Sequence, residues 1–111
     1  MTTQTDLTIP VSALKFDGAA TATAHGESWD MLQIGGLLQT VIARHAQHEI
    51  RDQALDTVSV TFDVSADAAT GSDIAFTSRI DRKTRTLVFA SGLASQTDRH
   101  LLKATIVFRI S

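Results

Sequence analysis

The sequence has 111 residues, of which 43% are hydrophobic and 20% are charged, and its formal net charge is −2. This length supports one hydrophobic core, and so small a charge gives no basis for electrostatic binding to nucleic acid or to an anionic membrane. The absence of cysteine excludes disulfides, a thiolate nucleophile and cysteine metal ligands. No apolar run reaches the length of a membrane span and no secretory leader pattern is visible, so we expect a cytoplasmic protein with one domain over residues 1–111.

The first structured part of the chain is expected to be a strand followed by a loop. In segment 13–24 apolar and polar residues alternate, which predicts one strand that is weakened or bulged at Gly18. Segment 25–30 has the composition of a loop. Ser28 or Asp30 is a suitable N-cap for a helix that follows it.

Segment 29–48 predicts one long helix. Its apolar residues recur at helical spacing over an unusually wide arc: Met31, Ile34, Leu37, Leu38, Val41 and Ile42. A helix this apolar has to be wrapped by other parts of the chain. Gly35 and Gly36 lie in its first turns, where each glycine costs roughly 1 kcal/mol relative to alanine. Either something approaches this backbone closely, or the helix begins only at these glycines.

Four strand-like segments follow the helix. Alternation predicts strands at 56–65, 73–82, 86–95 and 100–111, connected in order as hairpins. In the first of them the apolar set is expected to face inward, namely Val58, Val60, Phe62 and Val64. One strand, a long helix and four further strands give an α+β fold with an antiparallel five-stranded sheet. The dry face of that sheet requires the helix as its cover.

Three features follow one another in a characteristic order. They are the double glycine of the apolar helix, the strand VSVTFDVSADAATG that ends in a small-residue turn, and the hairpin IAFTSRIDRKTRTLVFASGLAS with its basic tip. With these features the chain resembles the hotdog-fold superfamily, and most of all its small acyl-CoA thioesterases of the phenylacetate-degradation type. The resemblance implies a hotdog fold, in which an antiparallel five-stranded sheet wraps around one long central helix.

The resemblance also implies a substrate site at the double glycine. In the family, backbone N–H groups near the start of the helix face the thioester carbonyl as an oxyanion hole, which assigns Gly36 as the catalytic donor and Gly35 as a close substrate contact. Gln39 and Thr40 follow on the same stripe of the helix, toward an expected cleft at a dimer interface. Gln39 is expected to hydrogen-bond the substrate carbonyl or to position a water, and Thr40 to contact the substrate.

The catalytic carboxylate of the family lies further along the helix, and that position is Ala43 here. Ile34 likewise replaces the histidine that usually precedes the glycine pair. Alanine has no acid–base chemistry, and another branch of the superfamily places its aspartate before the helix. Asp30 is therefore the predicted catalytic base, with a helix N-cap as its alternative role.

A basic hairpin tip is the expected site for the carrier. Hotdog enzymes often rest the phosphates of CoA on basic residues near the mouth of the cleft, which assigns Arg82, Lys83 and Arg85 to substrate binding. The alternative is a solvated turn that keeps a sheet edge from aggregating.

The predicted function is to bind or hydrolyse an acyl-CoA or acyl-carrier thioester, as a homodimer or homotetramer. Two alternatives stay open. One is a non-catalytic hotdog protein, because of Ala43, and the other is a hydroxyacyl thioester dehydratase or hydratase that uses His25. His45 and His48 stand three residues apart without a third ligand, so we expect no metal site, and no cofactor is implied.

Overall fold

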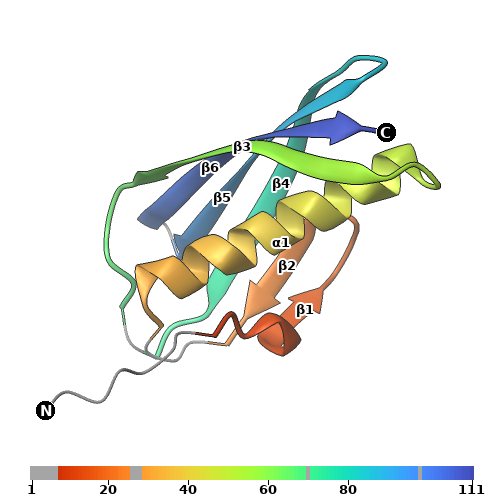
Figure 1. The fold of residues 1–111 in the computed structure, drawn as a ribbon. Helices are drawn as coiled ribbons and strands as arrows, with labels where there is room; N and C mark the ends of the chain where they lie inside the picture. Colours follow the sequence, from red (N-terminus) through yellow and green to blue (C-terminus); the bar gives the residue numbers. More distant parts are fainter. Residues whose placement is uncertain (1–7, 26–28, 70, 98) are drawn as a thin grey trace, which may run out of the picture.

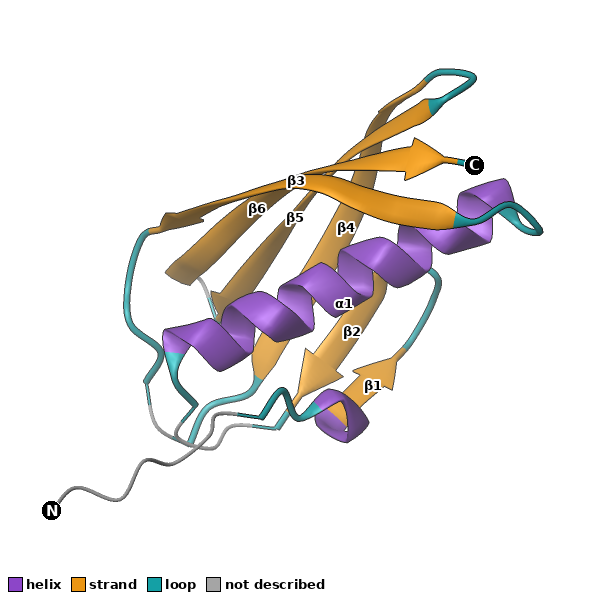
Figure 2. Cartoon of the chain, viewed as in Figure 1, coloured by secondary structure: helices purple, strands orange, loops and turns teal. Residues whose placement is uncertain are grey.

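The computed structural model describes residues 8–25, 29–69, 71–97 and 99–111. A long helix, α1 (Met31–Ile50), lies across one face of an antiparallel sheet (Figures 1 and 2). The strands follow the spatial order β1-β2-β4-β5-β6-β3. Their bounds are β1 Leu14–Phe16, β2 Thr21–Ala24, β3 Leu55–Val64, β4 Ile74–Lys83, β5 Leu87–Gln96 and β6 Arg99–Ile110, and a 3₁₀ turn, Val11–Ala13, precedes them. The predicted α+β class and the long apolar helix are confirmed.

The core lies between α1 and the central strands of the sheet. One side of the helix is completely buried, through Ile34, Leu37, Leu38, Val41, Ile42 and Ala46. These side chains meet the residues that alternate toward the helix along the strands, of which Phe76, Val88, Ala90, Ala104 and Ile106 are also fully buried. Burial of each large apolar side chain contributes about 1.5–3 kcal/mol, so this contact is what holds the helix on the sheet.

The helix packs tightly against β5 at Gly92. A Cβ atom on Gly92 would lie 2.7 Å from Ile42 Cδ1 and 2.8 Å from the backbone oxygen of Thr77. The backbone oxygen belongs to the neighbouring strand and cannot move aside without breaking the sheet. Glycine is therefore required at this position for the helix to approach so closely.

The N-terminal strand segment is two strands, not the single bulged strand that alternation predicts. β1 and β2 pair as an antiparallel hairpin, and the chain reverses over residues 17–20. Two hydrogen bonds close this reversal, because the Thr21 hydroxyl donates to the Asp17 carboxylate and the Asp17 N–H donates to the Thr21 carbonyl. Gly18 thus lies in a turn, and the sheet of the described residues has six strands instead of five.

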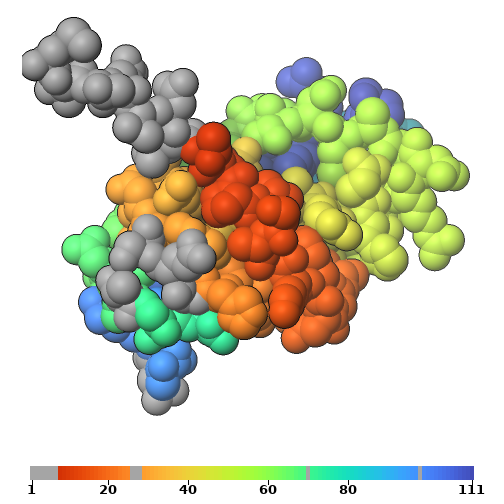
Figure 3. All heavy atoms as spheres, turned by 90° about the horizontal axis from the view of Figure 1, so that it is seen from below, coloured from red at the N-terminus to blue at the C-terminus, as the bar shows by residue number. Residues whose placement is uncertain are grey.

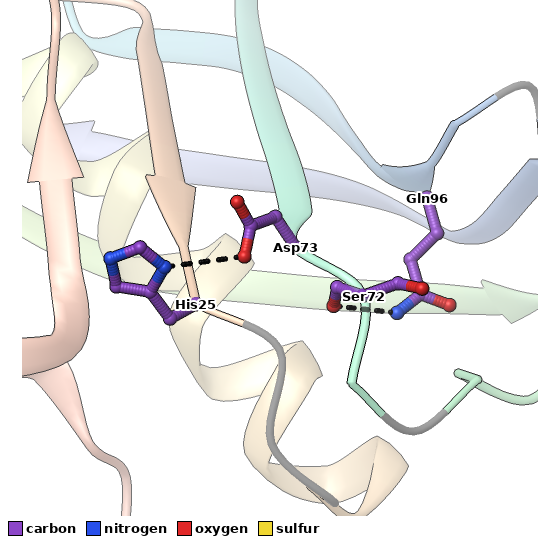
Figure 4. Close-up of polar contacts among 4 residues, drawn as sticks. All are labelled: His25, Ser72, Asp73 and Gln96. Carbon is purple, nitrogen blue, oxygen red and sulfur yellow. Dashed lines mark hydrogen bonds and ion pairs between the residues drawn. The ribbon is translucent and has the colours of Figure 1, made fainter.

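The strand after the helix pairs differently from the predicted succession of hairpins. β3 forms no hairpin with β4; it pairs with β6 at the edge of the sheet, and residues 65–73 carry the chain across to β4. Gln96, only 4% exposed, holds this connection. Its side chain accepts the Ala69 N–H at 2.7 Å and donates to the Ala69 carbonyl at 2.9 Å. It also donates to the Ser72 carbonyl at 3.0 Å (Figure 4).

β3 is an edge strand whose apolar residues are only partly covered. Val60, Phe62 and Val64 pair with inward-facing residues of β6, as alternation predicts. The helix, however, packs on β4, β5 and β6, so Phe62 stays 41% exposed and Val64 61% exposed. Val58 is exposed as well. The inward direction predicted for Val60, Phe62 and Val64 agrees with this pairing, but α1 leaves Phe62 and Val64 partly exposed.

Candidate functional site

A groove of about 440 Å³ lies at the N-terminal end of α1. It is lined by the first turns of the helix, by β3 and β6 and by the N-terminal segment, through Ile9, Met31, Leu32, Gly35, Gly36, Gln39, Phe62, Val64 and Leu102. Gln39 supplies the one polar side chain of this lining, and no hydrogen bond within the described residues engages it. Apolar walls with a single available amide are typical of a site that binds an apolar ligand and orients it by one polar group.

The two helix glycines in the groove have different surroundings. A Cβ atom on Gly35 would lie 3.4 Å from Phe62 Cε1 and 3.6 Å from Leu102 Cδ2, which is ordinary contact. A Cβ atom on Gly36 would lie 2.5 Å from Ile9 Cδ1 and 3.0 Å from Ile9 Cγ1. Gly36 is therefore the position where another part of the chain approaches the helix backbone closely.

The helix begins well before the glycines. α1 starts at Met31, so the alternative in which the helix begins only at Gly35 or Gly36 is wrong. Gly36 lies in the second turn, where the N–H of a helical residue is directed at the carbonyl four positions earlier, here that of Leu32. Its role as an oxyanion donor stays a prediction, and the Gly36 N–H would have to share its hydrogen with that carbonyl.

Asp30 is the N-cap of α1, which confirms the alternative role predicted for it. Its carboxylate accepts the Leu32 N–H at 3.0 Å, and the Gln33 side chain accepts the Asp30 N–H at 3.0 Å, which closes a capping box. The Asp30 side chain is exposed and is not part of the groove lining. Nothing in this geometry tests its predicted role as a base.

Two further helix positions, Thr40 and Ala43, make contacts within the chain instead of lining the groove. The Thr40 hydroxyl donates to the Gly36 carbonyl at 2.8 Å, and Thr40 is not part of the groove lining. Ala43 is half-buried and packs against the core. Of the predicted substrate contacts on α1, the structure therefore brings Gly35, Gly36 and Gln39 together in one groove and leaves Thr40 beside it.

The sequence matches a family model over residues 18–109, and that model describes the acyl-CoA thioesterase N-terminal domain. The chain belongs to this family. A comparison with curated protein sequences gives no match.

Several solved structures share the fold of this thioesterase family member. A thioesterase candidate from Ralstonia eutropha JMP134, related to phenylacetic acid degradation, is 16% identical and covers 93% of this chain and 92% of its own, with a TM-score of 0.73. The E. coli PaaI protein from the phenylacetic acid degradation operon is 10% identical, covers 82% and 71%, and has a TM-score of 0.73. A Bacillus halodurans protein solved with CoA is 14% identical, covers 88% and 71%, and also has a TM-score of 0.73. At these identities the likeness shows the hotdog fold alone.

The basic hairpin lies at the other end of this hotdog protein. Arg82 and Lys83 end β4 and Arg85 lies in the following turn, beside the end of β6 that meets the chain just after α1. The groove lies at the opposite end of the helix, where its lining includes Leu102 near the start of β6. In Figure 1 the tip of the β4–β5 hairpin lies toward the C-terminal end of α1. Within one chain, the structure does not bring the predicted CoA-phosphate residues to the helix glycines.

The histidines of the hotdog chain lie outside the groove. His25 Nδ1 lies 3.3 Å from the Asp73 carboxylate, and both side chains are exposed (Figure 4). His45 Nδ1 lies 2.9 Å from the Ser78 hydroxyl, and His48 is exposed in the last turn of α1. Among the described residues, no group of three or more potential ligands is placed to hold a metal ion.

A second hollow lies on the face of the sheet that points away from α1. It has a volume of about 530 Å³ and a more polar lining, which includes Thr77, Arg79, Ser91, Leu93, His100 and Lys103. This hollow contains neither helix backbone nor any residue predicted for the site.

In the described part of the chain, no helix is long and apolar enough to cross a membrane.

Sequence reasoning missed most of the groove lining. Phe62 and Val64 were expected to face inward, and their place at the groove follows from the edge position of β3 and its pairing with β6. Ile9 carries no periodic signal at all. Gln33 could have been found, because an Asp followed three residues later by Gln is a capping-box pattern.

Proposed function

We propose that this hotdog protein binds an acyl thioester in the groove at the start of α1. The observation that carries the proposal is an apolar groove that contains the helix glycines and one unengaged side-chain amide, in a chain of the acyl-CoA thioesterase family. CoA is the proposed carrier, and its presence in the Bacillus halodurans neighbour supports this choice.

Each part of the groove has a role in this proposal. The acyl chain contacts the apolar side chains, with a gain of about 0.8 kcal/mol for each methylene removed from water. The Gln39 amide donates a hydrogen bond to the thioester carbonyl, and Gly35 lets that group lie close to the helix backbone. Arg82, Lys83 and Arg85 lie at the end of the helix opposite to the groove of the same chain, so the proposed phosphate contact is made by the tip of a second subunit.

Hydrolysis requires a base in addition to these contacts. Asp30 is the proposed base: its carboxylate takes a proton from a water, and the water oxygen attacks the thioester carbon. The C–S bond then breaks, and the departing sulfur takes the proton from Asp30, which releases the CoA thiol and a carboxylic acid. Because Ala43 replaces the usual helix carboxylate, the alternative function is binding without turnover.

The decisive experiment measures binding and thiol release on the same samples. Thermal-shift titrations with CoA and with acyl-CoAs of increasing length are followed by a thiol assay, for the natural chain and for Asp30→Asn. Asparagine caps helices as well as aspartate does, so the variant keeps the helix start while it loses the base. Binding with release that Asp30→Asn abolishes supports the enzyme, whereas binding without release supports the non-catalytic alternative. No stabilisation by any acyl-CoA contradicts the proposal.

The proposed assembly is a homodimer formed through β3. This strand is an edge of the sheet and exposes Val58, Phe62 and Val64, and Leu32, which lines the groove, is 64% exposed. An exposed apolar edge strand is a template for pairing with another chain. We expect light scattering to give twice the chain mass at micromolar concentration, and Val58→Lys, which leaves the groove lining intact, to give monomer. A monodisperse natural monomer would contradict this assembly.

A further inference from the structure

The groove has a wall that the helix and the sheet do not provide. The Ile9 side chain lies directly on the helix at Gly36, where an added Cβ would be 2.5 Å from Cδ1, 3.0 Å from Cγ1 and 3.1 Å from Cγ2 of Ile9. Three of the side-chain carbons therefore cover the same glycine. Ile9 is 39% exposed and is one of the residues that line the groove.

The N-terminal segment is held on the helix at this place. The Gln33 side chain, which completes the capping box, donates to the Thr8 carbonyl at 3.0 Å. The Val11 N–H donates to the Ile9 carbonyl at 2.8 Å, at the start of the 3₁₀ turn. In the space-filling view the red N-terminal segment accordingly lies against the helix (Figure 3). One polar contact and one apolar side chain thus fix residues 8 and 9 to α1.

From this geometry we infer that Ile9 is a specificity-determining residue, which closes the groove over Gly36 and sets the longest acyl chain that the groove accepts. The inference rests on the proposed function. An acyl chain beside the helix glycines meets the Ile9 side chain, and further methylenes have to stay in water or displace it. The ligand that fits this groove is therefore a hydrocarbon acyl group of limited length.

The glycine at position 36 has a consistent explanation in these terms. Any side chain there would occupy the space that Ile9 fills, so glycine is what allows Ile9 to close the groove. At Gly35, where the nearest side-chain atom is 3.4 Å from an added Cβ, no such requirement exists.

Binding of an acyl-CoA series tests this inference. Dissociation constants are measured by calorimetry from acetyl-CoA to palmitoyl-CoA for the natural chain, for Ile9→Ala and for Val11→Ala. Val11 is a matched control, because it belongs to the same segment, is 43% exposed and is not part of the groove lining. In the natural chain we expect affinity to rise with acyl length and then to level off.

Ile9→Ala removes three carbons, so the affinity is expected to keep rising for about two further methylenes, about fourfold for each. For Val11→Ala the affinity should level off at the same acyl length as for the natural chain. The smaller truncation Ile9→Val should shift the limit in the same direction by less, and it serves if Ile9→Ala does not fold. An unchanged limit in both Ile9 variants, with binding intact, would overturn the inference and leave the proposed function standing. No acyl-CoA binding by any of these proteins would overturn both.

Discussion

Two glycines of this protein are in close contact with an isoleucine side chain, one in the core and one at the surface. Gly92 lies in the central strand β5 and contacts Ile42 of the helix, and both are buried in the core. Gly36 lies on the helix itself and contacts Ile9 of the N-terminal segment, at the surface groove. In both pairs an added Cβ would overlap the isoleucine side chain.

The two glycines differ in whether the atoms next to an added Cβ could move aside. At Gly92 an added Cβ also meets the backbone oxygen of Thr77, which is fixed by the pairing of β4 and β5. At Gly36 the three nearest atoms all belong to the side chain of Ile9, and none of them is backbone. The same glycine–isoleucine contact is therefore structural in the core and adjustable at the groove.

The largest expected effect is at the core glycine. Gly92→Ala should lower the free energy of unfolding by about 3 kcal/mol, because the added methyl overlaps both Ile42 and a backbone oxygen. Urea denaturation measures this change. Gly35→Ala is the control: its nearest neighbours are at ordinary contact distance, and alanine stabilises a helix by about 1 kcal/mol over glycine. A Gly92→Ala protein as stable as the natural chain would contradict the claim that glycine is required here for the close approach of α1 to β5.

The groove glycine should give a smaller effect that depends on its partner. In an Ile9→Ala background, Gly36→Ala should stabilise the protein by about 1 kcal/mol, the ordinary helix preference for alanine. In the natural chain the same substitution displaces Ile9 and this gain should be lost. A double-mutant cycle in urea measures a coupling of about 1–2 kcal/mol. Equal effects of Gly36→Ala in both backgrounds would mean that the Ile9–Gly36 contact is absent.

The smallest of the three effects concerns the helix cap that carries the N-terminal segment. Asp30→Ala should lower stability by about 1 kcal/mol, because it leaves the Leu32 N–H without its acceptor, while Asp30→Asn should be close to neutral. Thermal denaturation of the two variants gives the comparison. If both variants lose the same stability, the charge of Asp30 matters more than its capping hydrogen bond.

Periodic segments of this sequence were predictable, and pairing over long distances was not. The helix follows from apolar residues at helical spacing, which reflects a local geometry. The pairing of β3 with β6 does not follow from alternation, because the same alternation suits a hairpin with β4. The split of segment 13–24 into two strands depends on hydrogen bonds between Asp17 and Thr21, which the alternating pattern does not contain.

The grouping of candidate residues on the helix was predictable. Gly35, Gly36 and Gln39 share one helical stripe and do line one groove. Ile9 could not be assigned to the groove, because its contact with Gly36 joins residues far apart in the sequence and shows no periodicity. The basic tip lies at the end of the helix far from the glycines, and this placement depends on the strand pairing, which alternation does not specify.

The central claim, that an acyl thioester binds in the groove at the start of α1, can be tested by amide chemical shifts. The protein is titrated with a ketone analogue of a medium-chain acyl-CoA, which keeps the carbonyl and cannot be hydrolysed, while two-dimensional spectra are recorded. We predict saturable shifts at Gly35, Gly36 and Gln39, with Ser91 and Lys103 on the opposite face of the sheet unchanged. Saturable shifts confined to Ser91, Lys103 and their neighbours would place the ligand in the other hollow and contradict the account.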